Sequence, residues 1–124
     1  MREILFRGKG IKGFWNKGLL AHIGNAWYIS NKAGVATAFE VIPETIGQYT
    51  GLTDKNGKRI FEGDIVNFKT IAYTFKKCVV KYDEQYARFA CIDFNKAGFP
   101  MDISFVYEII GNIHDNPELL EVQR

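Results

Sequence analysis

The chain has 124 residues, of which 47% are hydrophobic and 24% are charged, and its net charge at pH 7 is +2. This length fits one domain with its own apolar core, and we interpret residues 1–124 as a single domain. No apolar run reaches the length of about 18 residues that a membrane-spanning helix needs, so we expect no membrane contact and a cytoplasmic location.

Short extended segments separated by glycine make up the first third of the chain. Apolar and polar side chains alternate over residues 2–7 and again over 35–41, which is typical of strands. In chain order we predict a strand over 2–7, a glycine-rich turn over 8–13, extended segments over 14–20 and 27–29, a reversal at 31–34, and a strand over 35–41 that Pro43 ends.

Two turns of different chemistry follow, with a strand after them. Asp54, Asn56 and Gly57 predict a reversal, either a hairpin turn with positive φ at Asn-Gly or a type I turn closed by a left-handed glycine. In the second turn, Gly63 tolerates a backbone angle that other residues resist. Asp64 can tie its carboxylate to nearby backbone N–H groups as the next strand starts. We therefore expect these five residues to serve the turns.

The segment over residues 76–94 predicts a hairpin whose register can be derived from its apolar pattern. A loop over residues 83–86 sets Cys78 opposite Cys91 and Val80 opposite Phe89, with one face almost entirely apolar. A slip by one residue would bring Lys81 onto that face. We expect two buried, reduced cysteines on neighbouring strands, because thiols stay reduced in the cytosol.

The last strand is predicted over residues 103–110, and it is largely apolar on both faces, which is typical of a covered strand. We expect the acidic C-terminal segment to supply part of that cover. Asn116 as N-cap and Pro117 in the first helical position predict a helix of about two turns that begins there.

Several short motifs run through the chain in a fixed order. They are Arg2-Glu3-Ile4 with Phe6-Arg7, Gly47-Gln48-Tyr49-Thr50-Gly51-Leu52, Asp54-Lys55-Asn56-Gly57, Glu62-Gly63-Asp64-Ile65-Val66, Tyr107-Glu108 with Ile110-Gly111-Asn112-Ile113, and Asp115-Asn116-Pro117-Glu118-Leu119-Leu120. Together they resemble the YopX-like family of bacteriophage and prophage proteins. The resemblance implies a β-rich fold built around an SH3-like barrel, a bacterial host cell, and no catalytic residues. We expect a mainly β fold, a small SH3-like β-barrel with additional hairpins and a short C-terminal helix.

Charge is divided unevenly along the chain. Residues 1–32 carry six basic residues and one acidic residue, a net +5, whereas residues 102–124 carry one basic and five acidic residues, a net −4. Opposite charges at the two ends can attract each other within one molecule or between copies. We expect the protein to form a homo-oligomer.

The N-terminal third also combines cations with aromatic rings. The residues concerned are Arg7, Lys9, Lys12, Trp15, Lys17, Trp27 and Tyr28. Such a surface suits single-stranded nucleic acid, whose bases stack on rings while its phosphates meet Lys or Arg. The competing interpretation is that both tryptophans anchor the core.

The sequence offers no constellation for catalysis, a cofactor or a metal. It lacks a phosphate-binding loop, and its two histidines and two cysteines form no recognisable site. A metal-dependent hydrolase would require Glu62, Asp64 and Asp83 to converge. We predict a non-enzymatic accessory protein without cofactors that acts through protein–protein contacts, including self-association, with a phage or host protein as partner. Nucleic-acid binding by the N-terminal third is the alternative.

Overall fold

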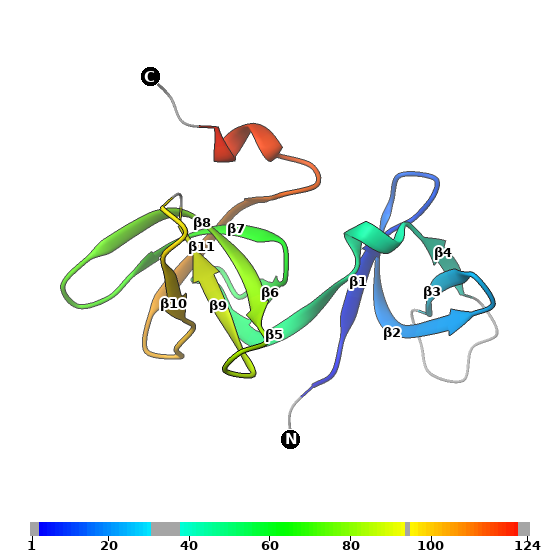
Figure 1. Ribbon diagram of the computed structural model, residues 1–124, viewed down its shortest axis with the longest axis horizontal. Coiled ribbons are helices and arrows are strands. Elements are labelled where there is room, and N and C mark those ends of the chain that lie inside the picture. The colour runs from blue at the N-terminus through cyan, green and yellow to red at the C-terminus, as the bar shows by residue number, and fades with distance from the viewer. Residues whose placement is uncertain (1–2, 31–37, 94, 122–124) are drawn as a thin grey trace. The chain divides into compact units, whose positions relative to one another are not determined.

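The computed structural model describes residues 3–30, 38–93 and 95–121. The chain divides into two compact units, residues 1–49 and 50–124, and both are built mainly from antiparallel strands (Figure 1). The prediction of a mainly β fold is therefore confirmed. None of the described segments forms a helix that is long and apolar enough to cross a membrane.

The first unit is a curled antiparallel sheet. Its elements are β1 (Phe6–Lys9), β2 (Trp15–Ile23), β3 (Ala26–Ser30), β4 (Phe39–Val41), the short 3-10 helix η1 (Pro43–Thr45) and the start of β5 (Gly47–Thr53). The strand order is β4-β3-β2-β1-β5. As predicted, the fourth strand ends at Val41 and Pro43 opens the next element. The predicted reversal at 31–34 lies outside the described residues.

Gly8 makes the curl of this sheet possible. A Cβ atom on Gly8 would lie 3.0 Å from the Val41 side chain and 3.2 Å from that of Ile29. Both of these side chains are almost fully buried. They belong to the core of the unit, and they pack directly against Gly8 because it has no side chain. An isolated bridge between Gly10 and Val41 brings β4 back to the chain that follows β1.

The second unit contains the end of β5 and a five-stranded antiparallel sheet. Its further elements are β6 (Arg59–Phe61), β7 (Asp64–Lys69), β8 (Thr74–Asp83), β9 (Arg88–Ile92), β10 (Gly98–Pro100), β11 (Val106–Asn112) and the 3-10 helix η2 (Pro117–Leu120). The order in the sheet is β10-β9-β8-β7-β11, and β6 pairs with β5.

Aromatic rings gather around Phe68 at the centre of this unit. The ring of Phe68 lies 4.7 Å from that of Phe75 and 5.6 Å from that of Tyr107, measured between centroids. Both cysteines belong to the same buried cluster, and both are free. The predicted pair of buried, reduced cysteines is confirmed.

The strand orders are linear. In the first unit β4 returns toward β1 through the isolated bridge between Gly10 and Val41, but no closed barrel forms within the described residues. The expected SH3-like barrel is therefore not confirmed. The physical reason is that β6 is short. Its hairpin with β5 contacts the five-stranded sheet through isolated backbone hydrogen bonds and not through a continuous ladder. The N–H of Lys55 donates to the carbonyl of Tyr107 and that of Gly63 to the carbonyl of Val80, each over 2.8 Å.

The hairpin of β8 and β9 has a register two residues away from the predicted one. Cys91 lies opposite Val80, where we expected Cys78. The reversal occupies residues 84–87, because Ala87 adopts a left-handed conformation with φ of 53°. A shift by two residues keeps every side chain on its predicted face, so the cysteines still point into the core.

The end of the chain differs from prediction in two places. β11 starts at Val106, not at 103, because the Asp102 carboxylate accepts hydrogen bonds from the backbone N–H and the hydroxyl of Ser104 and holds a turn there. A single 3-10 turn replaces the expected two-turn helix. Asn116 does not cap it, since its side-chain oxygen accepts the N–H of Asn112 over 3.2 Å.

Candidate functional site

The register of β1 and β2 gathers four residues of the predicted basic and aromatic surface. Arg7 lies opposite Lys17 and Lys9 opposite Trp15, and residues two apart on a strand share a face. The guanidinium carbon of Arg7 lies 4.9 Å from the centroid of the Trp15 ring, within range of a cation–π interaction.

The same register separates the two tryptophans. Trp27 lies opposite His22, and Tyr28 lies opposite Ala21. Alternation along β2 places Tyr28 on the face of Trp15 and Trp27 on the other. There the Trp27 ring stacks on His22 with centroids 4.0 Å apart and planes 2° apart. The residues of the predicted surface therefore do not all lie on one face, because Trp27 points away from the face that holds Arg7, Lys9, Trp15, Lys17 and Tyr28.

Lys12 lies in the turn between β1 and β2, beside a mostly apolar hollow of about 300 Å³. Three large apolar side chains around it are exposed: Ile11 by 62%, Phe14 by 75% and Phe39 by 42%. Lys12 and Glu40 also line the hollow. Exposed apolar side chains with a polar rim are typical of contact surfaces. The prediction missed this hollow, because Ile11 and Phe39 lie far apart in the sequence.

The predicted turn residues all take part in turns. Gly57 and Gly63 have φ of 80° and 89°, and Asn56 is not among the residues with positive φ, so the first reversal is the type I turn closed by a left-handed glycine. Asp64 accepts the N–H of Phe61 over 2.8 Å, as expected for a carboxylate that supports the start of a strand.

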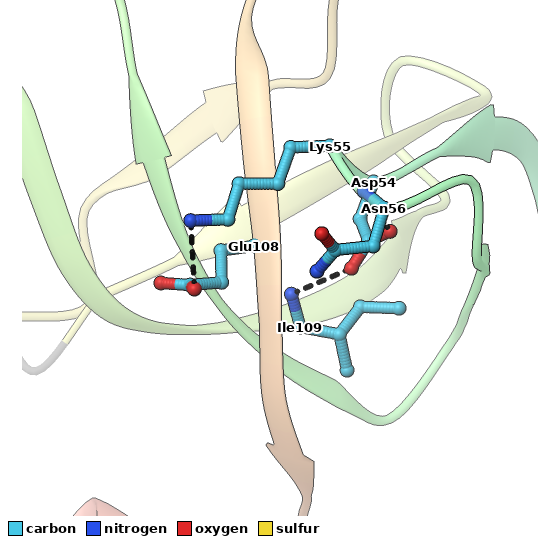
Figure 2. A network of polar contacts seen from close by, with 5 residues as sticks. All are labelled: Asp54, Lys55, Asn56, Glu108 and Ile109. Carbon is cyan, nitrogen blue, oxygen red and sulfur yellow. Dashed lines mark hydrogen bonds and ion pairs between the residues drawn. The ribbon is translucent and has the colours of Figure 1, made fainter.

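Asp54 does more than close its own turn. One carboxylate oxygen accepts the N–H groups of Asn56 and Lys58, each over 2.9 Å. The other accepts the N–H of Ile109 on β11 over 3.3 Å, as Figure 2 shows. Burial alone would raise the pKa of Asp54, but these three donors outweigh it and hold the pKa below its usual value.

Lys55 continues this link to β11. Its ammonium nitrogen lies 2.9 Å from a carboxylate oxygen of Glu108 (Figure 2). Hydrogen bonding to Lys55 and its positive charge lower the pKa of Glu108, and a further hydrogen bond from the Asn67 side chain acts in the same direction. Side chain and backbone thus tie the β5–β6 turn to the outer edge of the sheet.

Beside this ion pair lies a second hollow, of about 500 Å³, over β7, β8 and β11. Three lysines line it: Lys55, Lys69 and Lys76. The sequence prediction did not include them, because they come from three separate segments. One indication was present in the sequence, because Lys81 was already expected on the face of the hairpin that is turned away from the core.

The acidic residues that a metal-dependent hydrolase would require do not form a metal-binding group in the described part of the chain. No group of three or more His, Cys, Asp or Glu side chains is placed to hold a metal ion there, so the described Glu62, Asp64 and Asp83 form no such group. Burial raises the pKa of Cys78 to about 11 and that of Cys91 to about 12, which keeps both thiols protonated at neutral pH.

Comparisons with known proteins agree with this β-rich architecture. The model of the family described as YopX protein matches residues 16–121. A crystal structure of protein EF1440 from Enterococcus faecalis is similar over 98% of this chain and 100% of that one, with a TM-score of 0.55 and 26% sequence identity. No curated protein matches the chain.

Proposed function

Because the chain belongs to the YopX protein family and exposes an apolar hollow, we propose that it is a non-enzymatic accessory protein that acts through protein–protein contacts, including self-association. The match over residues 16–121 supports the family. The phage or prophage origin and the phage or host partner are part of this proposal, and they rest on the same resemblance.

The hollow beside the β1–β2 turn carries the proposal. Exposed Ile11, Phe14 and Phe39 lose contact with water when a partner covers them, at a gain of about 25 cal/mol for each Å² of apolar surface. A second copy is a suitable partner, because Lys12 and Glu40 lie on the same rim. In a twofold contact, Lys12 of each copy can meet Glu40 of the other.

Light scattering over a range of protein concentrations tests the self-association. We expect the mass to rise above the 14.1 kDa of one chain, and we expect Phe14→Asp to return it to that value by placing a charge in the apolar contact. Ile103→Asp is the control, since Ile103 is 87% exposed on a turn of the second unit. A mass of one chain at every concentration, or an equal effect of both variants, would refute the proposal.

The alternative is nucleic-acid binding by the first unit, and one observation favours it. Lys9, Trp15 and Lys17 share a face with Arg7, which is itself buried with its guanidinium over the Trp15 ring. Single-stranded oligonucleotides should then quench tryptophan fluorescence, and the quenching should weaken steeply as salt rises. The absence of quenching at low salt would exclude this alternative.

A further inference from the structure

A β-bulge gives the outer face of the second unit an extra lysine. Cys78 pairs with Val66 and Phe75 with Phe68, so Lys76 and Lys77 together oppose the single residue Asn67. Lys77 has φ of 54°, and its N–H donates to the side-chain oxygen of Asn67 over 3.0 Å. A bulge held in this way is a defined feature of the strand.

Both lysines of the bulge project to the outer face. Phe75 stacks on Phe68 and Cys78 belongs to the buried cluster, so the side chains on either side of the bulge point inward. Lys76 lines the hollow over β7, β8 and β11, and Lys77 lines a neighbouring hollow of about 340 Å³. The bulge therefore contributes one lysine to each hollow.

Lys76, Lys77 and Lys81 form a row of cations along β8, the lysine row, and further lysines line the same two hollows. Six lysines line them: Lys55, Lys69, Lys76, Lys77, Lys81 and Lys96. Two carboxylates, those of Glu108 and Asp93, line the same hollows. In the described part of the chain, Lys69, Lys76 and Lys81 form no ion pair. Like charges gathered on one face repel one another, and a bound polyanion would relieve that repulsion.

The shape of the row favours a chain of phosphates over one phosphate group. From Lys76 to Lys81 the strand extends over roughly 16 Å, at about 3.3 Å for each residue. A single phosphate is usually held by donors that converge on one point. Here the cations are spread along a line, as the backbone of a nucleic acid requires.

An exposed tyrosine lies near one end of β8. Tyr86, in the loop after β8, is 61% exposed, whereas the ring of Tyr73, in the turn before β8, lies 6.1 Å from that of the inward-pointing Phe75. The guanidinium carbon of Arg88 lies 4.7 Å from the centroid of the Tyr86 ring. Rings that accompany a basic groove offer stacking positions for unpaired bases, whereas the bases of a duplex are already stacked on one another.

We propose that the lysine row on the outer face of the second unit binds the phosphate backbone of single-stranded nucleic acid, with Tyr86 as a stacking position for a base. This site is separate from the face of the first unit considered above, and it does not depend on self-association.

Fluorescence anisotropy with a labelled oligodeoxythymidylate of about 12 nucleotides tests the site on the full chain. The variant Lys76→Gln/Lys81→Gln removes two cations of the row. Its matched control, Lys9→Gln/Lys17→Gln, removes two from the first unit. Circular dichroism establishes that each variant is folded.

Salt dependence provides the decisive readout. Each phosphate contact to a single strand contributes about 0.7 to the slope of log K against log salt, so losing two should flatten the slope by about 1.4. Between about 50 and about 200 mM NaCl, the unmodified protein should then lose about sevenfold more affinity than the variant does. We expect Tyr86→Ala to weaken binding by at least about fivefold.

Three results would overturn the proposal. One is the absence of binding by the unmodified protein at low salt. Another is a flatter slope for the Lys9→Gln/Lys17→Gln control alone, which would place the nucleic acid on the first unit. The third is equal binding of duplex DNA or of a glutamate peptide with no effect of Tyr86→Ala, which would show a general attraction of polyanions.

Discussion

Asp54 and Asp93 occupy equivalent positions in two turns of the same construction. The Asp93 carboxylate accepts the N–H groups of Asn95 and Ala97, just as Asp54 accepts those of Asn56 and Lys58. A left-handed residue closes each turn, Gly57 in one and Lys96 in the other. The difference is that Asp54 is buried and also reaches Ile109 on a distant strand.

This difference predicts unequal costs for the same substitution. Asp54→Ala should lower the free energy of unfolding by about 2–4 kcal/mol, because it leaves buried N–H donors without their charged acceptor. Asp93→Ala should cost only about 1 kcal/mol, since water can replace the carboxylate in an exposed turn. Urea unfolding followed by circular dichroism measures both values. Equal decreases in the free energy of unfolding would mean that the hydrogen bond from Ile109 to Asp54 adds nothing to stability.

The depressed pKa of Asp54 predicts how its contribution depends on pH. The folded chain keeps this carboxyl ionised at lower pH than the unfolded chain does, whose value is near 3.8. The stabilisation is therefore fully present well above 3.8 and is lost as the pH falls through the lower folded value. The gap in unfolding free energy between the unmodified protein and Asp54→Asn should narrow below about pH 4. A constant gap between neutral pH and pH 2 to 3 would contradict this account.

Among the elements, β11 packs closely against the segment that contains η2. The register of β11 shifts between Ile109 and Gly111. At Gly111 the chain passes so close to the segment around η2 that a Cβ atom would lie 2.6 Å from the Asn116 side-chain oxygen and 2.9 Å from Leu119. The expected cover of the last strand by the C-terminal segment is confirmed at this contact.

Gly111→Ala should therefore displace η2 and lower the free energy of unfolding by about 1–3 kcal/mol, the usual cost of overpacking. Gly98→Ala is a suitable control, because its Cβ would meet only the flexible end of Ile92 at 3.2 Å. Thermal unfolding compares the two variants. If Gly98→Ala lowers the melting temperature as much as Gly111→Ala does, the close approach at Gly111 does not cause the loss of stability.

Alternation within single strands could be predicted from the sequence, but not which segments come together. The inward faces of β8 and β9 and the chemistry of both turns followed from the positions of Val80, Gly57 and Gly63. The register did not, because nothing in the sequence shows that Ala87 adopts a left-handed conformation. The lysine row was missed for a similar reason, since a bulge is needed to turn both Lys76 and Lys77 outward.

Seen as a whole, the molecule contains two β units whose described surfaces offer hollows for contact. The hollow of the first unit is apolar and has one charge of each sign on its rim. The hollows of the second unit are basic. Different partners suit these two surfaces, and each can be tested without disturbing the other. The single family domain over residues 1–124 and the absence of catalysis remain predictions.

Hydrogen–deuterium exchange in dilute and concentrated solution tests the central claim, that the apolar hollow of the first unit is a contact surface between copies. We expect exchange to slow with concentration over residues 10–12, 14, 16 and 38–40, which line the hollow, and we expect Phe14→Asp to abolish this slowing. The account would be contradicted if exchange in these residues did not depend on protein concentration. It would also be contradicted if exchange slowed with concentration only in the second unit.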